Sequence, residues 1–269
     1  MVETTVPGGC LAQDWLHPEW ANLRFHQGAC PEASSISGSA VSGSTFAATG
    51  PSAHAVRFRI GTTRMWGIGL LPLGWARYVG VPAQSMADAV VDGHAHPAFT
   101  AFAPLAATLF RDEPDEDAEL ARIAAYFQTF PPRPVPDEAR IQAIHAALVD
   151  PELDGIAGLV RRTGVSQRTL ERLCARHFGF SPKLLLRRQR FMRSLSQYVL
   201  DPSLRWIGAI DGQYHDQAQF VRDFHQFMGM TPSHYASIDK PILSAIMHER
   251  ARFAGAAVQA LDGPGGGAG

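Results

Sequence analysis

Two short stretches of the sequence carry side chains suited to hydrogen bonding with the base edges of a nucleic acid. Arg168 and Arg172 lie four residues apart in the first stretch, and Gln217 and Arg222 lie five apart in the second. Arginine and glutamine form paired hydrogen bonds that match the major-groove edges of guanine and adenine. These residue types and spacings predict two helices that each present a polar, base-reading face.

Helical spacing separates this polar side of each stretch from an apolar side that would pack inward. The residues left on the polar sides are Gln167, Arg168, Glu171, Arg172, Ala175 and Arg176 in the first stretch, and Asp216, Gln217, Gln219, Arg222, Asp223 and Gln226 in the second. Ser166 is a good N-cap for the first helix. Ser181 begins a further helix whose free backbone N–H groups attract anions, with Lys183 beside them.

The elements that must position these side chains form a repeat. The strings LERLCARHFGFSP and FVRDFHQFMGMTP, which begin at Leu170 and Phe220, match after a shift of 50 residues. Each string has helical apolar spacing and a glycine stop, and a Ser-Pro or Thr-Pro then starts another helix. We therefore predict two helix-turn-helix units in tandem, with recognition helices at 166–178 and 216–228 and one helix over 181–200 between them.

The charge is unevenly divided along the 269 residues, whose net charge is −1. Residues 1–150 hold 9 Lys/Arg and 15 Asp/Glu, a charge of −6. Residues 151–255 hold 15 Lys/Arg and 9 Asp/Glu, a charge of +6, and Asp262 supplies the remaining −1. Only the second part is basic, so only this part is expected to meet a polyanion.

The hydrophobic pattern predicts an α+β protein. Residues 1–71 show the partial alternation of strands, and residues 72–130 change to helical spacing, so we expect a sensor or dimerisation domain over 1–130. The proline-rich residues 131–136 are the predicted linker. An all-α DNA-binding domain is expected over 137–254, and residues 255–269 are expected to form a flexible tail.

Composition indicates a cytoplasmic protein that does not associate with a membrane. Cys10, Cys30 and Cys174 form no CxxC pair and leave one thiol unpaired in any scheme, which suits a reducing compartment. The first residues lack the basic and apolar runs of a signal peptide. No apolar run approaches the roughly 20 residues that a membrane span needs.

The basic part resembles the DNA-binding domain of the AraC/XylS family of transcription regulators. The matching strings are GVSQRTLERLCARHFGFSPKLLLRRQRF (164–191) and YHDQAQFVRDFHQFMGMTPSHY (214–235). The resemblance implies two recognition helices in successive major grooves, about 34 Å apart. It implicates Arg168, Glu171 and Arg172 in the first unit and Gln217, Val221 and Arg222 in the second. The full set of candidate DNA contacts is Ser166, Gln167, Arg168, Glu171, Arg172, Lys183, Asp216, Gln217, Gln219, Val221 and Arg222.

One position departs from the family pattern. The turn of the second unit usually has glycine directly before its tyrosine, whereas here Gln213 stands before Tyr214 and Gly212 lies one place earlier. If this position requires a positive φ, Gln213 is strained. The turn would then shift by one residue and change the direction of the second recognition helix.

The acidic part has a looser resemblance. Residues 49–92 are similar to the sensor-like domain that precedes this DNA-binding domain in one AraC subgroup. The resemblance implies a small cupin-like β-barrel followed by helices. It also leads us to expect a homodimer and a small-molecule effector.

Two other features bear on this interpretation. His94 and His96 have the spacing of metal ligands, but no third ligand is evident, so no metal or cofactor is predicted. Cys10 and Cys30 leave open a DNA-repair protein of the AraC-linked type that accepts a methyl group. A protein-interaction module without DNA binding is a further alternative. The favoured prediction is a sequence-specific transcription regulator that is not an enzyme and whose partner is double-stranded DNA.

Overall fold

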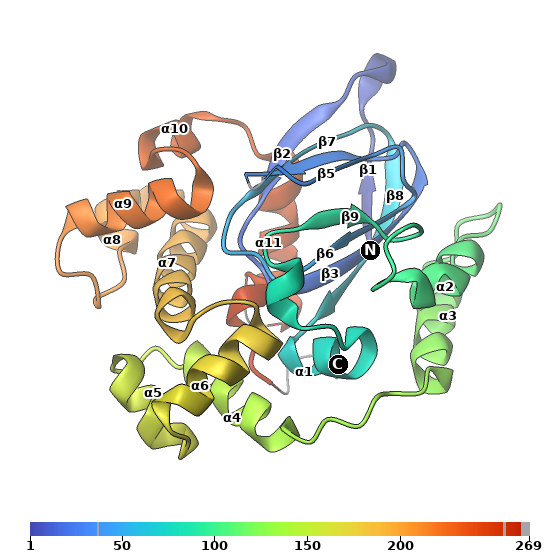
Figure 1. Ribbon diagram of the computed structural model, residues 1–269. Helices are drawn as coiled ribbons and strands as arrows, with labels where there is room; N and C mark the ends of the chain where they lie inside the picture. Colours follow the sequence, from blue (N-terminus) through green and yellow to red (C-terminus); the bar gives the residue numbers. More distant parts are fainter. Residues whose placement is uncertain (37, 255–256, 265–269) are drawn as a thin grey trace.

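Short strands dominate the first part of the chain in the computed structural model, which describes residues 1–36, 38–254 and 257–264 (Figure 1). In β7 every second residue is buried, as expected for a strand with one face on a core. The strands are β1 (Val2–Thr4), β2 (Ala12–Leu16), β3 (Ala21–Gly28), β4 (Glu32–Ser35), β5 (Ala40–Ser42), β6 (Phe46–Thr49), β7 (Val56–Ile60), β8 (Thr63–Leu70) and β9 (Val90–Asp92). Over the described residues they form two antiparallel sheets, ordered β1-β8-β3-β6-β9 and β2-β7-β4-β5.

The larger sheet is covered on both faces, so most of β3 is buried although apolar and polar residues alternate along it. Leu23 and Phe25 of β3 pack on one face against the π-helical turn Trp75–Val79, α2 (Ala103–Thr108) and α3 (Glu116–Thr129). The short helix α1 (Pro72–Gly74) comes directly before the π-helical turn. Apolar residues such as Ala47, Phe58 and Val90 fill the space between the two sheets. The sheets therefore face each other as a small barrel-like unit with helices on one side.

An ion pair fixes α3 to the larger sheet. Glu119 is fully buried and accepts hydrogen bonds from Arg64 Nη1 at 2.8 Å and from Trp66 Nε1 at 2.6 Å. Burial opposes ionisation of this carboxyl, but the bonds from Arg64 and Trp66 outweigh it, and the pKa of Glu119 lies below its usual value. The carboxylate therefore holds helix and sheet together in its charged form.

The boundary between the predicted strand part and helical part needs a correction. Strand β9 lies beyond residue 71 and pairs with Ala47, Ala48 and Thr49 of β6 at the edge of the larger sheet. A strand of three residues between two turns carries too little alternation to be recognised from sequence. Residues 90–92 form a strand because they pair with β6, and not because of a pattern in their own sequence.

The helical half begins after the extended, proline-rich residues 131–136. Its helices are α4 (Glu138–Val149), α5 (Gly155–Thr163), α6 (Gln167–Leu173), α7 (Pro182–Leu200), α8 (Arg205–Ala209), α9 (Gln217–Met228), α10 (Pro232–Ser237) and α11 (Pro241–Ala254). The pairs α5–α6 and α8–α9 lie at opposite ends of the long helix α7 (Figure 1). The predicted α+β fold with two helix-turn-helix units joined by a long helix is confirmed. Among the described residues, no helix has the length and apolar character to cross a membrane.

The two halves are packed against each other. Trp20 of the strand half lies in one core with α4 to α7, and Ala53 and Ala55 lie in another with α7, α9 and α10. The backbone N–H of Ala55 donates to the carbonyl of Phe227 at the end of α9, at 2.7 Å. The helical half therefore has a fixed orientation on the sheets.

Residues after α11 are not the flexible tail that the sequence predicted. Ala257, Val258 and Ala260 are buried, and Gln259–Leu261 form a 3₁₀ turn against the strand half. The amide of Gln259 donates to the carbonyl of Ala21 at 3.2 Å. Residues 255–256 and 265–269, the rest of the predicted tail, lie outside the described residues.

Candidate nucleic-acid interface

The first recognition helix starts where the sequence predicted and presents its polar side to solvent. Ser166 caps α6 by accepting the backbone N–H of Thr169 at 3.3 Å. Arg168 and Arg172 are exposed, and no ion pair to either is found among the described residues. Two free guanidinium groups on one exposed helix face can reach a base edge or a phosphate.

The other two candidates on α6 contact each other. The side-chain amide of Gln167 donates to a carboxylate oxygen of Glu171 at 3.1 Å, one helical turn apart. Both residues are exposed. Beyond them the helix widens into a π-helical turn, Cys174–Phe178, and ends at Gly179 with φ of 86°. The predicted helix 166–178 is therefore one continuous element with a π turn at its end.

The residues predicted on the second recognition helix divide into two groups: some cap the start of the helix, and others are exposed on its outer face. Asp216 caps α9 by accepting the N–H of Gln219 at 2.6 Å, and Gln219 accepts the N–H of His215 at 3.2 Å. These two side chains hold the helix start in the manner of a capping box. Gln217 and Arg222 are exposed, and so is Gln226, which accepts a hydrogen bond from Arg187 Nη2 at 2.7 Å.

Two further residues of α9 are more buried than the sequence predicted. Val221 is half-buried and packs against the helical core, so only part of it can reach a thymine methyl group. Asp223, which helical spacing placed on the polar side, is 1% exposed, so its predicted exposure is wrong. Its carboxylate accepts hydrogen bonds from Arg187 Nε at 3.2 Å, Arg190 Nη2 at 3.1 Å and Tyr214 at 3.1 Å.

The arginines of α7 are mostly used inside the protein. Arg187 and Arg190 bind Asp223, and Arg193 binds Asp211. Arg188 is fully buried, with its guanidinium 3.8 Å from the ring centre of Trp20, and burial lowers its pKa to about 9. None of this could be read from helical spacing, because the partners come from other helices and from the sheets.

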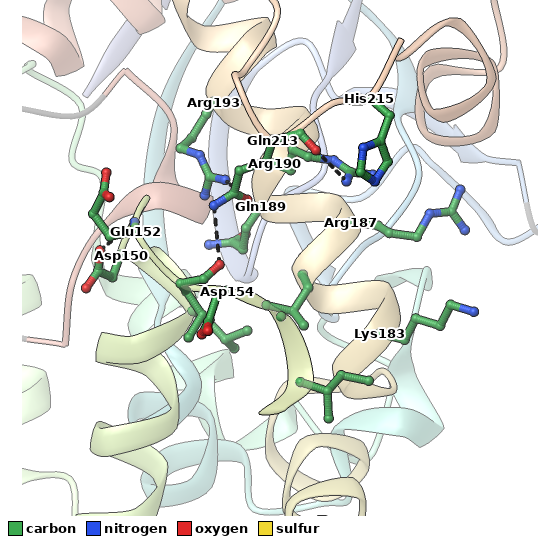
Figure 2. Close-up of a pocket in the computed structure, with 15 residues that line it drawn as sticks. Asp150, Glu152, Asp154, Lys183, Arg187, Gln189, Arg190, Arg193, Gln213 and His215 are labelled. Atoms are coloured by element: carbon green, nitrogen blue, oxygen red, sulfur yellow. Dashed lines mark hydrogen bonds between the residues drawn. The ribbon is translucent and has the colours of Figure 1, made fainter. Parts of the chain in front are cut away.

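A cleft of about 610 Å³ separates the two helix-turn-helix units along one side of α7 (Figure 2). Asp150 and Glu152 lie at the left in this view, Asp154 lies nearer the middle, and Lys183 and Arg187 lie at the right. Lys183 is exposed in the first turn of α7, whose N-cap is Ser181. It is therefore placed for contact with an anion near a helix N-terminus.

The turn that departs from the family pattern is unstrained. Asp88 is the one non-glycine residue with a positive φ among the residues described, so Gln213 adopts an ordinary backbone conformation. Tyr214 follows it with its hydroxyl on Asp223. The second unit is therefore formed, and α9 starts at the predicted place despite the missing glycine.

The other candidate chemistries find little support in the geometry. Burial raises the pKa of the Cys174 thiol to about 12, so this cysteine is unreactive. Cys10 is exposed and Cys30 half-buried, and the methyl-acceptor alternative rests on these two thiols. His94 bonds to Thr45, and the described residues contain no group of three side chains that could hold a metal ion.

A protein-family model agrees with this geometry. Residues 159–237 match a helix-turn-helix domain family. A search of curated protein sequences finds no match. Among solved structures, ToxT from Vibrio cholerae O395 is similar at 10% identity over 84% of this chain and 93% of that chain, with a TM-score of 0.44.

Two further ToxT structures show the same level of likeness. The P21 form from Vibrio cholerae has 10% identity over 87% of this chain and 95% of that chain, with a TM-score of 0.45. ToxT from Vibrio cholerae O395 bound to (E)-4-(8-methylnaphthalen-1-yl)but-3-enoic acid has 9% identity over the same shares and a TM-score of 0.43.

The tandem units and their exposed basic faces define a DNA-binding protein of the helix-turn-helix class. More narrowly, residues 159–237 are an AraC-type helix-turn-helix domain, the domain of a family of transcription regulators, as the sequence resemblance predicted.

Proposed function

We propose that the chain is a sequence-specific transcription regulator in which α6 and α9 read successive major grooves of double-stranded DNA. The proposal rests on a contrast between the arginines of α7 and those of the two recognition helices. The arginines on α7 are bound to carboxylates or buried, whereas Arg168, Arg172 and Arg222 on the recognition helices are exposed. A protein that keeps its free guanidinium groups on these two faces has them available for bases and phosphates.

The first experiment measures specific binding by fluorescence anisotropy on sites selected from random DNA. Arg172→Ala and Arg222→Ala are each expected to weaken specific binding by about 1–3 kcal/mol if they reach base edges. Arg57→Ala, an exposed arginine of β7, is the matched control and should bind like the wild type. Equal loss on random DNA would reassign both arginines to phosphates, and no loss would remove them from the interface.

Lys183 gives a second, independent measurement. Lys183→Ala should weaken binding to all sequences alike and reduce the slope of affinity against salt by about 1. If the wild-type protein has no salt-dependent affinity for DNA, the chain is instead a protein-interaction module.

We also propose a small-molecule effector that binds between the sheets and α11. A small apolar cavity of about 40 Å³ lies between the sheets, and a groove of about 630 Å³ beneath α11 continues it. Both ring nitrogens of His26 face this interior without a hydrogen-bond partner among the described residues. A Cβ at Gly67 would meet nothing within 4 Å, so Gly67→Phe should fill the groove.

The effector proposal is tested with anilinonaphthalene sulfonate as an apolar probe. Its fluorescence should rise with the wild type and with Arg57→Ala, and much less with Gly67→Phe. Equal fluorescence from all three proteins would mean that the groove does not take up an apolar molecule.

We further propose that the protein is cytoplasmic and forms a homodimer through its first domain. Leu120 is 53% exposed on the outer side of α3, beside the exposed alanines 121, 124 and 125. Such a face suits a second copy of the same helix. Leu120→Arg should therefore yield monomers in analytical ultracentrifugation, and an unchanged mass would move the interface elsewhere.

A further inference from the structure

Gln213, the residue that replaces the usual glycine, connects the two helix-turn-helix units. Its side-chain Nε2 donates to the carbonyl oxygens of Pro151 at 2.6 Å and Leu153 at 3.3 Å, in the loop between α4 and α5. In the part of the chain that the structure describes, no other hydrogen bond joins residues 137–180 directly to residues 202–237. The direct polar link between the units is therefore this one side chain.

The orientation of the Gln213 amide is determined by its partners. Arg193 Nη2 donates to Oε1 at 3.1 Å, so the oxygen must face the guanidinium and the nitrogen must face the two carbonyls. The backbone is also held, because Arg190 Nη1 donates to the Gln213 carbonyl at 3.3 Å and Gln213 N–H donates to Asp211 at 2.9 Å. The side chain thus projects from a fixed turn.

Each unit also rests on the strand half, but on this side of the molecule the described residues of the two units are not packed against each other. The cleft of about 610 Å³ lies between them (Figure 2). Each unit contributes to a different apolar core. Both units attach to α7, so small bending or rotation about α7 would change the distance between α6 and α9. Gln213 spans the cleft at the place where such movement would open it.

We propose that Gln213 is a strut that sets the spacing and relative rotation of the two recognition helices, and so restricts the protein to one spacing between half-sites. This inference rests on the proposed DNA-binding function. One additional base pair moves a half-site by about 3.4 Å and turns it by about 34°. A rigid pair of helices cannot follow that change, and the advantage of the second, intramolecular contact is lost. A glycine in place of Gln213 leaves α7 as the direct link.

The DNA experiment compares probes in which the two half-sites of a selected site are moved apart or together by one base pair. The wild type should lose about tenfold in affinity on either altered probe, since one half-site is then released. Gln213→Ala should bind the original probe more weakly and lose much less on the altered probes. Gln213→Glu, which keeps the size and the acceptor for Arg193 but loses both donors, should behave like Gln213→Ala.

Gln197→Ala is the matched control, because Gln197 is an exposed glutamine of α7. It should show the wild-type dependence on spacing. A wild-type dependence in both Gln213 variants would overturn the strut. Melting temperatures within a few degrees of the wild type are expected for all three variants, since Gln213 and Gln197 are both exposed.

A second measurement needs no DNA and separates the strut from the proposed function. Spin labels at Ala157→Cys in α5 and Ala236→Cys in α10, both exposed, report the distance between the units in a Cys10→Ser, Cys30→Ser background. Gln213→Ala and Gln213→Glu should broaden the distance distribution, and Gln197→Ala should not. Equal widths would reject the strut, even if the protein binds DNA. Failure of every variant to bind DNA would reject the proposed function and leave the distance result to decide the strut.

Discussion

At the scale of single residues, the buried carboxylate of Asp223 determines how α9 is held on α7. Two arginines and a tyrosine donate to it in a site that is 1% exposed. Asp223→Ala should lower the free energy of unfolding by about 3 kcal/mol, because Arg187 and Arg190 lose their partner. Urea denaturation measures this. Asp112→Ala, in an exposed loop, is the control and should change it by less than about 0.5 kcal/mol. Equal losses would show that these ion pairs add nothing.

Sequence could predict which residues of the recognition helices point outward, but not which arginines of α7 are occupied. Arg168, Arg172, Gln217 and Arg222 are exposed as helical spacing indicates. Arg188 carries the same charge and lies in the same basic stretch, yet it stacks on Trp20 from the strand half. Its partner lies more than 160 residues away, and no local pattern marks such a pair.

At the scale of elements, the starts of the helices follow from their capping residues. Asp216 accepts the N–H of Gln219 at the first turn of α9. Asp216→Ala should therefore lower the free energy of unfolding by about 1 kcal/mol, whereas Asp216→Ser retains a capping oxygen and should stay within a few tenths of the wild type. Thermal or urea unfolding distinguishes the two. A similar loss in both variants would mean that the charge of Asp216, and not its hydrogen bond, stabilises the helix.

Elements with strong local signals were predictable, and elements that depend on a distant surface were not. The recognition helices begin and end where the repeat places them. Residues 257–261 precede the glycine-rich sequence GPGGGAG, which predicts that they belong to a tail, but they pack on β3 through Gln259. The start of α11 is likewise held by Asp14 of β2, which accepts the N–H groups of Ile242 and Leu243 at 2.9 Å.

At the scale of the whole molecule, buried histidines at the junction of the two halves make the stability of the folded protein depend on pH. His17 bonds to Tyr235 at 2.8 Å, and burial together with the charge of Lys240 lowers its pKa to about 3. Burial lowers the pKa of His145, which packs edge-on against Trp20, to about 4, although a backbone hydrogen bond opposes this. Both histidines are therefore neutral in the folded protein at pH 5, where an unfolded histidine with a pKa near 6.5 is mostly protonated.

The sign of the pH dependence follows from this difference. Below about pH 6.5 the unfolded chain binds protons that the folded chain does not, so stability is present above pH 6.5 and is lost as the pH falls toward about 4. The urea midpoint should be lower at pH 5 than at pH 7.5, and His145→Gln should reduce that difference. His225→Gln, at an exposed site of α9, should leave it unchanged. An identical difference in all three proteins would exclude His145 as a cause.

The buried guanidinium of Arg188 raises the question of what joins the two halves. It donates to the carbonyls of Glu19 at 3.3 Å and Ser52 at 2.9 Å, but its Nε and Nη2 have no partner among the described residues. A buried charge with unpaired donors carries a desolvation cost that an apolar side chain of similar length avoids. Arg188→Met should therefore melt at the wild-type temperature or above it.

Arg188→Ala is the comparison, because it removes the same charge and also leaves a cavity against Trp20. Its free energy of unfolding should fall by about 2–5 kcal/mol, as for other long buried side chains. Differential scanning calorimetry of both variants separates packing from charge. A large loss in Arg188→Met as well would mean that the two carbonyl bonds and the contact with Trp20 outweigh desolvation. The junction would then be held by its polar contacts and not by apolar packing.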